Sequence, residues 1–480
     1  MTTDALGIRA TRKHLWLSVA LTLIIGLIAF RVTASATSGF LVWSDGLAYF
    51  FHARSLVLDG NSDITNEFEE FDRRYPLKPK ESSVMDSVRR NVSRHADSNL
   101  IVSPWPIGMG MVLAPFYALG FVAESAIANF EGREADTYGI VPQYFFCFGS
   151  LVFGWLGFWA TYLCCRQVAD QSRSYLAAAS AVFGGPAAFY IFINPSMAHA
   201  VSFGLTSILV LLCWRRWVAG TVWHAMFLPG FILGLLVAIR LQNALFGLLL
   251  VAVVIRELCR SGWLRAAAGA AAGLATSAIP MAALLMHSAA YGPVHSKFTI
   301  QQGGIALIGS YPVHLKSPFF FDVLFSCRHG AFYWTPILAL GAIGLVWAIR
   351  RESWAVVLFS VFLLNVCLIG GIGIIDPNGR PATFDISNWN GHWKGGASFG
   401  MRYLTECTAL FAVGLATLLN IWRTRKAKLL WSIGLSALVV WNSLLMLAYG
   451  LNTVSRTYCV RYDDMWHGVT QAIGGIVRRL

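Results

Sequence analysis

The sequence contains few charged residues for its length. Only 13% of its 480 residues are charged, and 56% are hydrophobic. Soluble domains carry about 25% charged residues. Several apolar runs reach about 18 residues or more, the length that a helix needs to cross a hydrocarbon core about 30 Å thick. The composition excludes an ordinary soluble domain and predicts an all-α polytopic membrane protein.

Sequence signals for a metal site, a redox site or a cleaved leader are also absent. The nine cysteines are scattered, and most fall in apolar segments, where thiols behave as small hydrophobic groups. None forms a CxxC or Cys/His ligand spacing, so no zinc or redox site is expected. The N-terminus shows no small-residue cleavage site, and the first apolar segment is expected to remain as a membrane anchor. No internal repeat is visible.

Basic clusters separate the apolar runs and predict the topology. The net charge of +13 is interpreted as Lys and Arg held on the cytoplasmic side, and no nucleic-acid partner is expected. Arg9, Arg12 and Lys13 precede the first apolar segment and predict a cytoplasmic N-terminus. With the later clusters also inside, the predicted spans are 15–33, 138–163, 175–193, 197–214, 222–239, 241–257, 265–288, 332–349, 354–374, 403–421 and 429–449.

The predicted spans define the domain organisation. It consists of a cytoplasmic N-terminus (1–14), the first span (15–33), a large periplasmic loop (34–137), a transmembrane core (138–449) with outer loops at 289–331 and 375–402, and an outer C-terminal tail (450–480). Residues 105–130 are also apolar enough to span, but counting them would invert every later basic loop. Because prolines flank and interrupt them, they are interpreted as one or two interfacial helices. A twelfth span is the alternative.

Polar residues are concentrated in the predicted outer loops. Between Asp59 and Asp97 the sequence has nine acidic and seven basic residues. Loops longer than about 15 residues are usually functional or disordered, whereas the predicted inner loops are short. Large outer loops with minimal inner ones place the chemistry outside.

Several of the outer segments carry cationic and aromatic side chains. They read "NPSMAHA", "RLQN", "YGPVHSKFTIQQGG", "FSCRHGAFYWTP" and "HWKGGASFGMRYLTE". Amide and aromatic groups suit sugar rings, and cations suit a phosphate. The alternative is an aromatic belt with snorkelling basic residues. The candidate ligands for a donor's phosphate or sugar are Arg402, Lys394, His199, Arg240, His392, Trp393 and Arg54.

These segments, together with "WSDGLAYFFHARSLVLDGNSDITNEF" and "SPWPIGMGMVLAPFYALG", resemble the GT-C superfamily of membrane glycosyltransferases. They are similar to bacterial relatives of the protein O-mannosyl and aminoarabinose transferases. The resemblance covers about residues 15 to 420. It implies a GT-C-like fold, a polyprenyl-phosphate sugar donor, and inverting transfer on the outer face of the cytoplasmic membrane.

By this resemblance Asp45 is the catalytic carboxylate, with Asp59 and Asp63 as acidic helpers. Many relatives have an adjacent acidic pair, whereas here Gly46 follows Asp45. This departure leaves a divalent metal in doubt, and no cofactor is expected. The Lys-Pro-Pro-Leu lysine of some relatives is also missing, because residues 103–106 read "SPWP". Another cation must take its role.

The residue chemistry gives a parallel argument. A positioned carboxylate can act as general base on an acceptor hydroxyl, and cations stabilise the charge on a departing phosphate. For Asp45 the alternative role is an N-cap of a helix over 46–58. For Arg402, which can bind phosphate in a bidentate manner, the alternative is an i,i+4 pair with Glu406.

Two other functions remain open from the sequence. A chain with eleven or twelve spans could be a transporter or a flippase for lipid-linked sugars, although transporters usually show inverted repeats. A scaffold in an envelope complex is the third interpretation. Asp45 and Arg402 at one outward site would favour the transferase, and their placement on opposite faces would favour the others. The acceptor, which could be a lipid, a glycan or a protein, is left open.

Overall fold

The computed structural model describes residues 8–36, 40–74, 92–94, 99–220, 223–291, 305–308, 311–313, 319–371, 398–421, 424–456 and 458–477. These residues are mainly helical, and their strands form only two short antiparallel pairs. The protein is an all-α membrane protein, as the composition predicts.

Small elements follow the first long helix. The elements of this region are α1 (Ile8–Ala36), α2 (Asp45–Arg54), the π-helical turn η2 (Ser55–Asp59), α3 (Thr65–Arg74), β1 (Ser93–Arg94), β2 (Ile101–Val102) and α5 (Gly108–Glu131). In the β1–β2 pair, Ser93 lies opposite Val102.

The middle of the chain forms most of the long apolar helices. Its elements are α6 (Ile140–Cys165), α7 (Gln171–Phe183), η3 (Phe189–Ile193), α8 (His199–Ala219), η4 (Trp223–Met226), α9 (Phe227–Ile239), η5 (Leu241–Phe246), α10 (Gly247–Ser261) and α11 (Trp263–Tyr291). α7 begins where the Asp170 side chain accepts a hydrogen bond from the Arg173 backbone N–H, which is the usual way of capping a helix.

The last part of the chain closes the bundle. Its elements are β3 (Ile305–Ile308), β4 (Tyr311–Val313), α12 (Phe320–Phe325), α13 (Ala331–Trp334), α14 (Ile337–Ile349), α15 (Ser353–Gly370), η7 (Arg402–Cys407), α16 (Thr408–Ile421), α17 (Arg425–Gly450) and α18 (Tyr462–Val477). α14 packs closely on α16, because a Cβ at Gly344 would lie 2.0 Å from the Gly414 carbonyl oxygen. Small residues at membrane helix interfaces permit such close packing.

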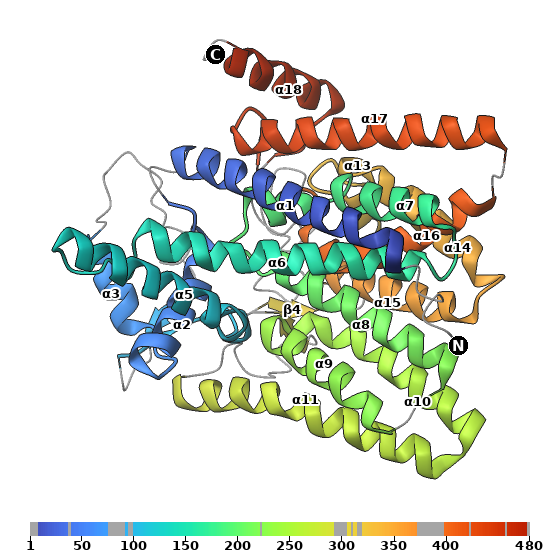
Figure 1. Cartoon of the computed structure of the whole chain (residues 1–480), viewed down its shortest axis with the longest axis horizontal. Helices are drawn as coiled ribbons and strands as arrows, with labels where there is room; N and C mark the ends of the chain where they lie inside the picture. Colours follow the sequence, from blue (N-terminus) through green and yellow to red (C-terminus); the bar gives the residue numbers. More distant parts are fainter. Residues whose placement is uncertain are drawn as a thin grey trace, which may run out of the picture.

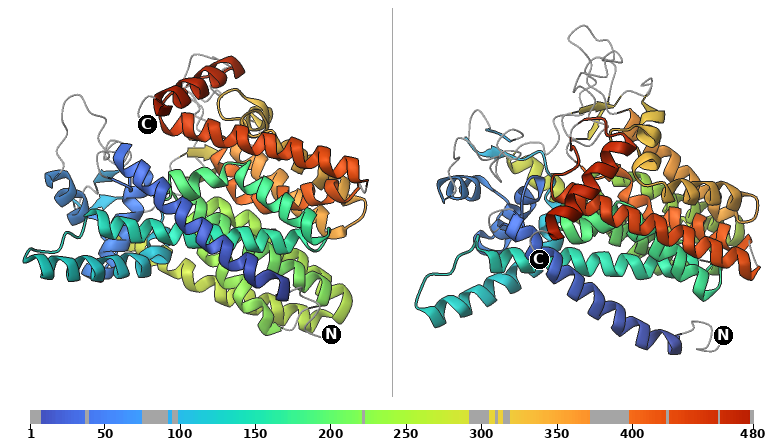
Figure 2. Two further views of the ribbon diagram at one scale, coloured as in Figure 1. Left: turned by 45° about the horizontal axis from the view of Figure 1, so that its top comes forward. Right: turned by 90° about the horizontal axis from the view of Figure 1, so that it is seen from above.

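The long helices lie roughly side by side along the horizontal direction of Figure 1. α2, α3 and most of α5 lie at the left end of the molecule, and α1 begins toward the right end. The α6–α7, α10–α11, α14–α15 and α16–α17 connections also lie at the right end. Figure 2 shows α1 on the outside of the bundle. The basic clusters at these connections therefore lie at the same end as the start of α1.

Nine of the eleven predicted spans coincide with apolar helices, whereas 175–193 and 241–257 do not, the latter being divided into η5 and α10. Among the described residues, seven helices are long and apolar enough to cross a membrane, and three shorter apolar helices accompany them. Residues 175–193 were predicted as one span but form α7 and η3, separated at Gly184, Gly185 and Pro186, since proline has no N–H to continue a helix. Residues 108–131 form one helix through Pro115 and are among the seven. Their interfacial position stays a prediction.

A disulfide joins Cys327 to Cys459. It connects the segment before α13 with the segment between α17 and α18, both of which the topology prediction places outside. The sequence analysis proposed no partner for either cysteine, because sequence spacing does not reveal a bridge across 132 positions. Disulfides form and persist in oxidising compartments, so the bridge agrees with an outer location for both segments.

Candidate active site

Asp45 is the first residue of α2, not its N-cap. The cap position is Ser44, which has a φ of 57° and makes no capping hydrogen bond with its side chain. The Ser44 hydroxyl lies 3.4 Å from Asp45 Oδ1. As the acidic residue of the first turn, Asp45 lies in the favourable field of the helix N-terminus. The predicted alternative role as an N-cap is therefore wrong.

The structure explains why Gly46 follows Asp45. A Cβ at position 46 would lie 2.2 Å from Ser196 Oγ and 2.9 Å from the Ser196 carbonyl oxygen. Ser196 belongs to the turn that precedes α8 and is buried. This close approach leaves no room for a side chain, and so for a second carboxylate, at position 46.

Arg402 lies beside Asp45. Arg402 Nη1 is 3.4 Å from Asp45 Oδ2, and each side chain is nearly a fifth exposed, at 19% and 18%. Its Nη2 is 3.4 Å from the Tyr403 hydroxyl. Since Arg402 opens the 3₁₀ turn η7, positions four apart are not aligned as they are on an α-helix. Among the described residues, Arg402 and Glu406 do not form the alternative i,i+4 pair.

Glu406 instead forms a buried cluster with Arg240 and His199. Its Oε1 lies 2.8 Å from Arg240 Nη1 and 3.3 Å from His199 Nδ1. Arg240 Nη2 also donates to Gln242 Oε1 at 3.2 Å. α8, η5 and η7 each contribute to this cluster or to its support. The structure thus brings together His199 and Arg240, which were both predicted as ligands, with Glu406. The sequence analysis named Glu406 only as an alternative partner of Arg402.

Tyr403 links the two charge pairs. Its ring centroid lies 5.1 Å from the guanidinium carbons of both Arg240 and Arg402. Cation–π contacts of this kind favour a positive charge over a ring within about 6 Å. Asp45, Arg402, Tyr403, Arg240 and Glu406 therefore form one polar group, which we call the Asp45 site. The sequence analysis missed Tyr403, since one tyrosine in an apolar chain gives no signal.

The predicted acidic helpers have other contacts. Asp59 ends η2, so it lies about 20 Å along the helix axis from Asp45. Its carboxylate contacts Arg54 at 3.3 Å and Asn66 at 2.9 Å. Asp63 Oδ1 accepts hydrogen bonds from the backbone and the hydroxyl of Thr65 at the start of α3.

Arg54 is likewise held away from Asp45. It contacts Glu67 at 2.9 Å and lies over the Tyr138 ring. The pKa of Glu67 is raised to about 8, mainly by burial and secondly by a hydrogen bond with Asp59. Hydrogen bonds hold the pKa of Asp59 below its usual value. These groups connect α2 with α3. The remaining predicted ligands, His392, Trp393 and Lys394, lie outside the described residues.

Among the described residues, no group of three or more His, Cys, Asp or Glu side chains could hold a metal ion. The Asp45 site itself offers two carboxylates, each paired with an arginine. Whether the protein needs a divalent metal stays an open prediction.

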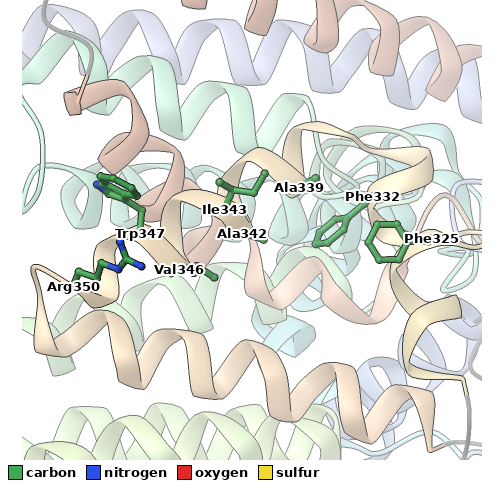
Figure 3. A pocket seen from close by; sticks show the side chains of 8 residues that line it. All are labelled: Phe325, Phe332, Ala339, Ala342, Ile343, Val346, Trp347 and Arg350. Atoms are coloured by element: carbon green, nitrogen blue, oxygen red, sulfur yellow. The ribbon is translucent and has the colours of Figure 1, made fainter.

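An apolar groove of about 490 Å³ lies along α14, apart from the Asp45 site. Figure 3 shows its lining, which consists of Phe325, Phe332, Ala339, Ala342, Ile343, Val346, Trp347 and Arg350. This lining contains no carboxylate and shares no residue with the Asp45 site. It cannot supply acid–base chemistry.

The fold is that of a polytopic helical membrane protein. The chain is similar to the crystal structure of ArnT from Cupriavidus metallidurans in the apo state, with 13% identity, a TM-score of 0.52, and coverage of 97% of this chain and 77% of that one. The same protein bound to undecaprenyl phosphate gives 14% identity and a TM-score of 0.50 over the same shares of the two chains. These likenesses establish the fold.

A further similar structure is the archaeal oligosaccharyltransferase AglB from Archaeoglobus fulgidus, in complex with an inhibitory peptide and a dolichol-phosphate. Its identity is 13%, its TM-score is 0.44, and the match covers 92% of this chain and 56% of that one, which is too distant to support an argument. No family model matches the sequence. No curated protein matches it either.

Proposed function

We propose that the protein is a membrane glycosyltransferase. It transfers a sugar from a polyprenyl-phosphate-linked donor to an envelope acceptor, which is a lipid, a polysaccharide or a protein. The reaction takes place at the outer face of the cytoplasmic membrane and inverts the anomeric carbon. Asp45 is the general base, and Arg402 binds the donor's phosphate.

The observation that carries this proposal is the contact between Asp45 and Arg402, 3.4 Å apart and 357 positions apart in the sequence. An acid and a cation at one place are what glycosyl transfer from a phosphate requires. The fold adds support, because the similar ArnT structure was obtained with undecaprenyl phosphate bound.

The contact suggests how the reaction proceeds. The donor's phosphate competes with Asp45 for Arg402, and the displaced carboxylate turns toward the acceptor. Asp45 takes the proton of the acceptor hydroxyl as its oxygen forms a bond to the anomeric carbon. The bond from that carbon to the phosphate oxygen breaks, and the lipid phosphate leaves with its bonding electrons. Arg402, supported by His199 or Lys394, stabilises the charge that develops on the phosphate.

Two observations support an outward orientation of the site. The basic connections and the start of α1 lie toward the opposite end of the bundle from α2 and α3 (Figure 1), and positive charge marks cytoplasmic loops. The Cys327–Cys459 bridge agrees with an oxidising compartment for its two segments.

A transporter or flippase would be favoured by Asp45 and Arg402 on opposite faces of the molecule. Their direct contact supports the transferase instead.

The test is a comparison of envelope glycans by mass spectrometry in cells with and without the gene, together with binding of undecaprenyl phosphate by the purified protein in nanodiscs. We expect one glycan modification to disappear with the gene and the lipid phosphate to bind. An unchanged glycan profile combined with no binding would overturn the proposal.

A further inference from the structure

Arg456 lies in the segment between α17 and α18, which the sequence analysis treated only as an outer tail. Its guanidinium carbon lies 6.0 Å from the centroid of the Trp43 ring and 5.1 Å from that of the Tyr449 ring. Trp43 stands two positions before Asp45, and Tyr449 is in the last turn of α17. The C-terminal segment therefore reaches the start of α2, although more than 400 positions separate them in the sequence.

Among the described residues, Arg456 is bonded only to neutral groups. Its Nη2 donates to the Tyr449 carbonyl oxygen at 3.1 Å and to the Gly450 carbonyl oxygen at 3.4 Å. Its Nε is buried and makes no hydrogen bond within the described part of the chain. Carbonyl oxygens at a helix C-terminus satisfy two N–H groups of an arginine but leave its charge without a counter-ion.

Three further buried polar atoms, in Arg402 and in the two residues whose rings contact Arg456, also lack hydrogen-bond partners among the described residues. These atoms are Trp43 Nε1, Arg402 Nε and the Tyr449 hydroxyl oxygen. Tyr449 lies close enough to both Arg402 and Arg456 to interact electrostatically with each. Buried polar groups are nearly always hydrogen-bonded, so these unpaired donors, with two arginines close to Tyr449, indicate a place for an acceptor that carries negative charge.

The arginines near the Asp45 site also outnumber the carboxylates. In the described residues Asp45 contacts Arg402, and Glu406 contacts Arg240. Arg456 forms no ion pair with a carboxylate among the described residues. Three arginines thus share two carboxylates, and a dianionic phosphate monoester or a phosphodiester would supply the missing negative charge.

The position of Arg456 is fixed from both sides. On one side, the Thr453 hydroxyl contacts the Ala448 carbonyl oxygen at 3.0 Å and the Gly468 carbonyl oxygen at 2.8 Å. On the other side, Cys459 is bonded to Cys327, and the Val460 N–H donates to the Cys327 carbonyl oxygen at 3.2 Å. A cation on a tethered segment loses less conformational freedom when it binds an anion, which favours affinity.

We infer that Arg456, placed by the Cys327–Cys459 bridge, is a second ligand for the phosphate of the lipid-linked donor and acts together with Arg402. This inference rests on the proposed function and deepens it. Trp43 Nε1 and the Tyr449 hydroxyl are available as further donors to the same phosphate.

The test measures the affinity of the full-length protein in nanodiscs for undecaprenyl phosphate. Arg456→Gln retains N–H groups for the Tyr449 and Gly450 carbonyl oxygens but removes the charge. We expect it to weaken binding by about 10- to 100-fold, the range for loss of a charged hydrogen-bond partner, with an unchanged unfolding temperature. Arg456→Lys is expected to recover part of the affinity. Arg461→Gln, on the exposed part of the same segment, is the matched control and is expected to bind like wild type.

The bridge is tested separately by the Cys327→Ser/Cys459→Ser variant. It should weaken binding when Arg456 is present and have no additional effect in the Arg456→Gln background. Wild-type affinity in Arg456→Gln, with affinity lost in Arg402→Gln, would overturn the inference and leave the proposed function standing. A wild-type protein that does not bind undecaprenyl phosphate would instead overturn the proposed function. A fall in unfolding temperature with affinity intact would reduce Arg456 to a cap of α17.

Discussion

Asp45 and Arg402 form an ion pair across 357 positions of the sequence, with 3.4 Å between Oδ2 and Nη1. The distance is long for a charge-assisted hydrogen bond, which is normally about 2.7–2.9 Å, and both side chains are partly exposed. Exposed or partly exposed pairs contribute little to stability. The pair is therefore better suited to exchanging partners with a substrate than to holding the helices together.

Asp45→Asn should abolish most of the transfer activity. The amide cannot take a proton, and loss of a general base typically costs about 10²- to 10⁴-fold in rate. Folding and donor binding should be retained, because the N-cap position of α2 is Ser44 and not Asp45. The measurement is sugar transfer by the purified variant in nanodiscs.

Asp59→Asn is the matched control for Asp45, since it lies at the other end of the same helical segment. It should transfer sugar at close to the wild-type rate. If Asp45→Asn folds, binds the donor and still reacts at the wild-type rate, Asp45 is not the base.

Arg402→Lys should weaken donor binding although the charge remains, because lysine lacks the planar fork that grips phosphate oxygens. Binding of undecaprenyl phosphate to the variant measures the effect. Arg350→Lys, at the other end of the bundle, is the control and should bind normally. Photo-crosslinking of the lipid phosphate to the α14–α15 connection instead of η7 would contradict this assignment.

Glu406→Gln should destabilise the protein strongly. Glu406 is buried and neutralises Arg240 at 2.8 Å, and breaking a buried ion pair costs about 3–5 kcal/mol. Thermal unfolding in nanodiscs measures the loss. Glu69→Gln, in an exposed pair with Arg94, should change stability by less than about 0.5 kcal/mol. Equal stability of the two variants would show that Glu406 has no structural role.

The stability of the α2–α3 region should fall as the pH rises. The pKa of Glu67 is raised from 4.5 to about 8, so the folded protein holds a proton that the unfolded chain releases. The stabilisation is therefore complete below about pH 4.5 and is lost as the pH passes 8. Hydrogen exchange of α3 across this range measures it. The Glu67→Gln variant should show a flatter pH dependence, and an equally steep one would exclude Glu67 as the cause.

Residues 34–137 should be accessible from outside the cell. Single cysteines at Glu69 and Asn129, both exposed, should react with a membrane-impermeant thiol reagent in intact, outer-permeabilised cells. Native Cys259 is exposed at the end of α10, on the predicted cytoplasmic side, and should remain unlabelled. Labelling at Glu69 with protection at Asn129 would make 108–131 a twelfth span.

The sequence predicted the helical elements well because membrane helices depend on local composition. A run of apolar residues must satisfy its own backbone hydrogen bonds in lipid, so α6, α11 and α17 are visible without any knowledge of their neighbours. The break between α7 and η3 was missed, although Gly184, Gly185 and Pro186 are a local signal for it. Arg402 and Arg240 also followed as candidates from residue type and loop location, and Asp45 followed from these together with the family resemblance.

Contacts between distant segments could not be obtained in this way. The choice of partner for Glu406 depended on η7 being a 3₁₀ turn that directs its side chain toward Arg240 and His199. Arg456 and the Cys327–Cys459 bridge were missed, since nothing local in the sequence indicates what a tail segment lies against. Asp59 and Asp63 were grouped with Asp45 because they are near it in sequence, yet they contact Arg54 and Thr65.

By itself the sequence determined that this chain is a polytopic helical membrane protein with its polar chemistry in a few loops. The reason is that the free energy of placing a segment in the bilayer depends on the hydrophobicity and charge of its own residues. Only the tertiary structure decided which of those polar groups meet. Asp45 pairs with Arg402, and Arg456 comes to lie beside Trp43, because helix packing brings the ends of α2, η7 and α17 together at one place. Such contacts depend on the shape and packing of every intervening helix, and no local stretch of sequence contains that information.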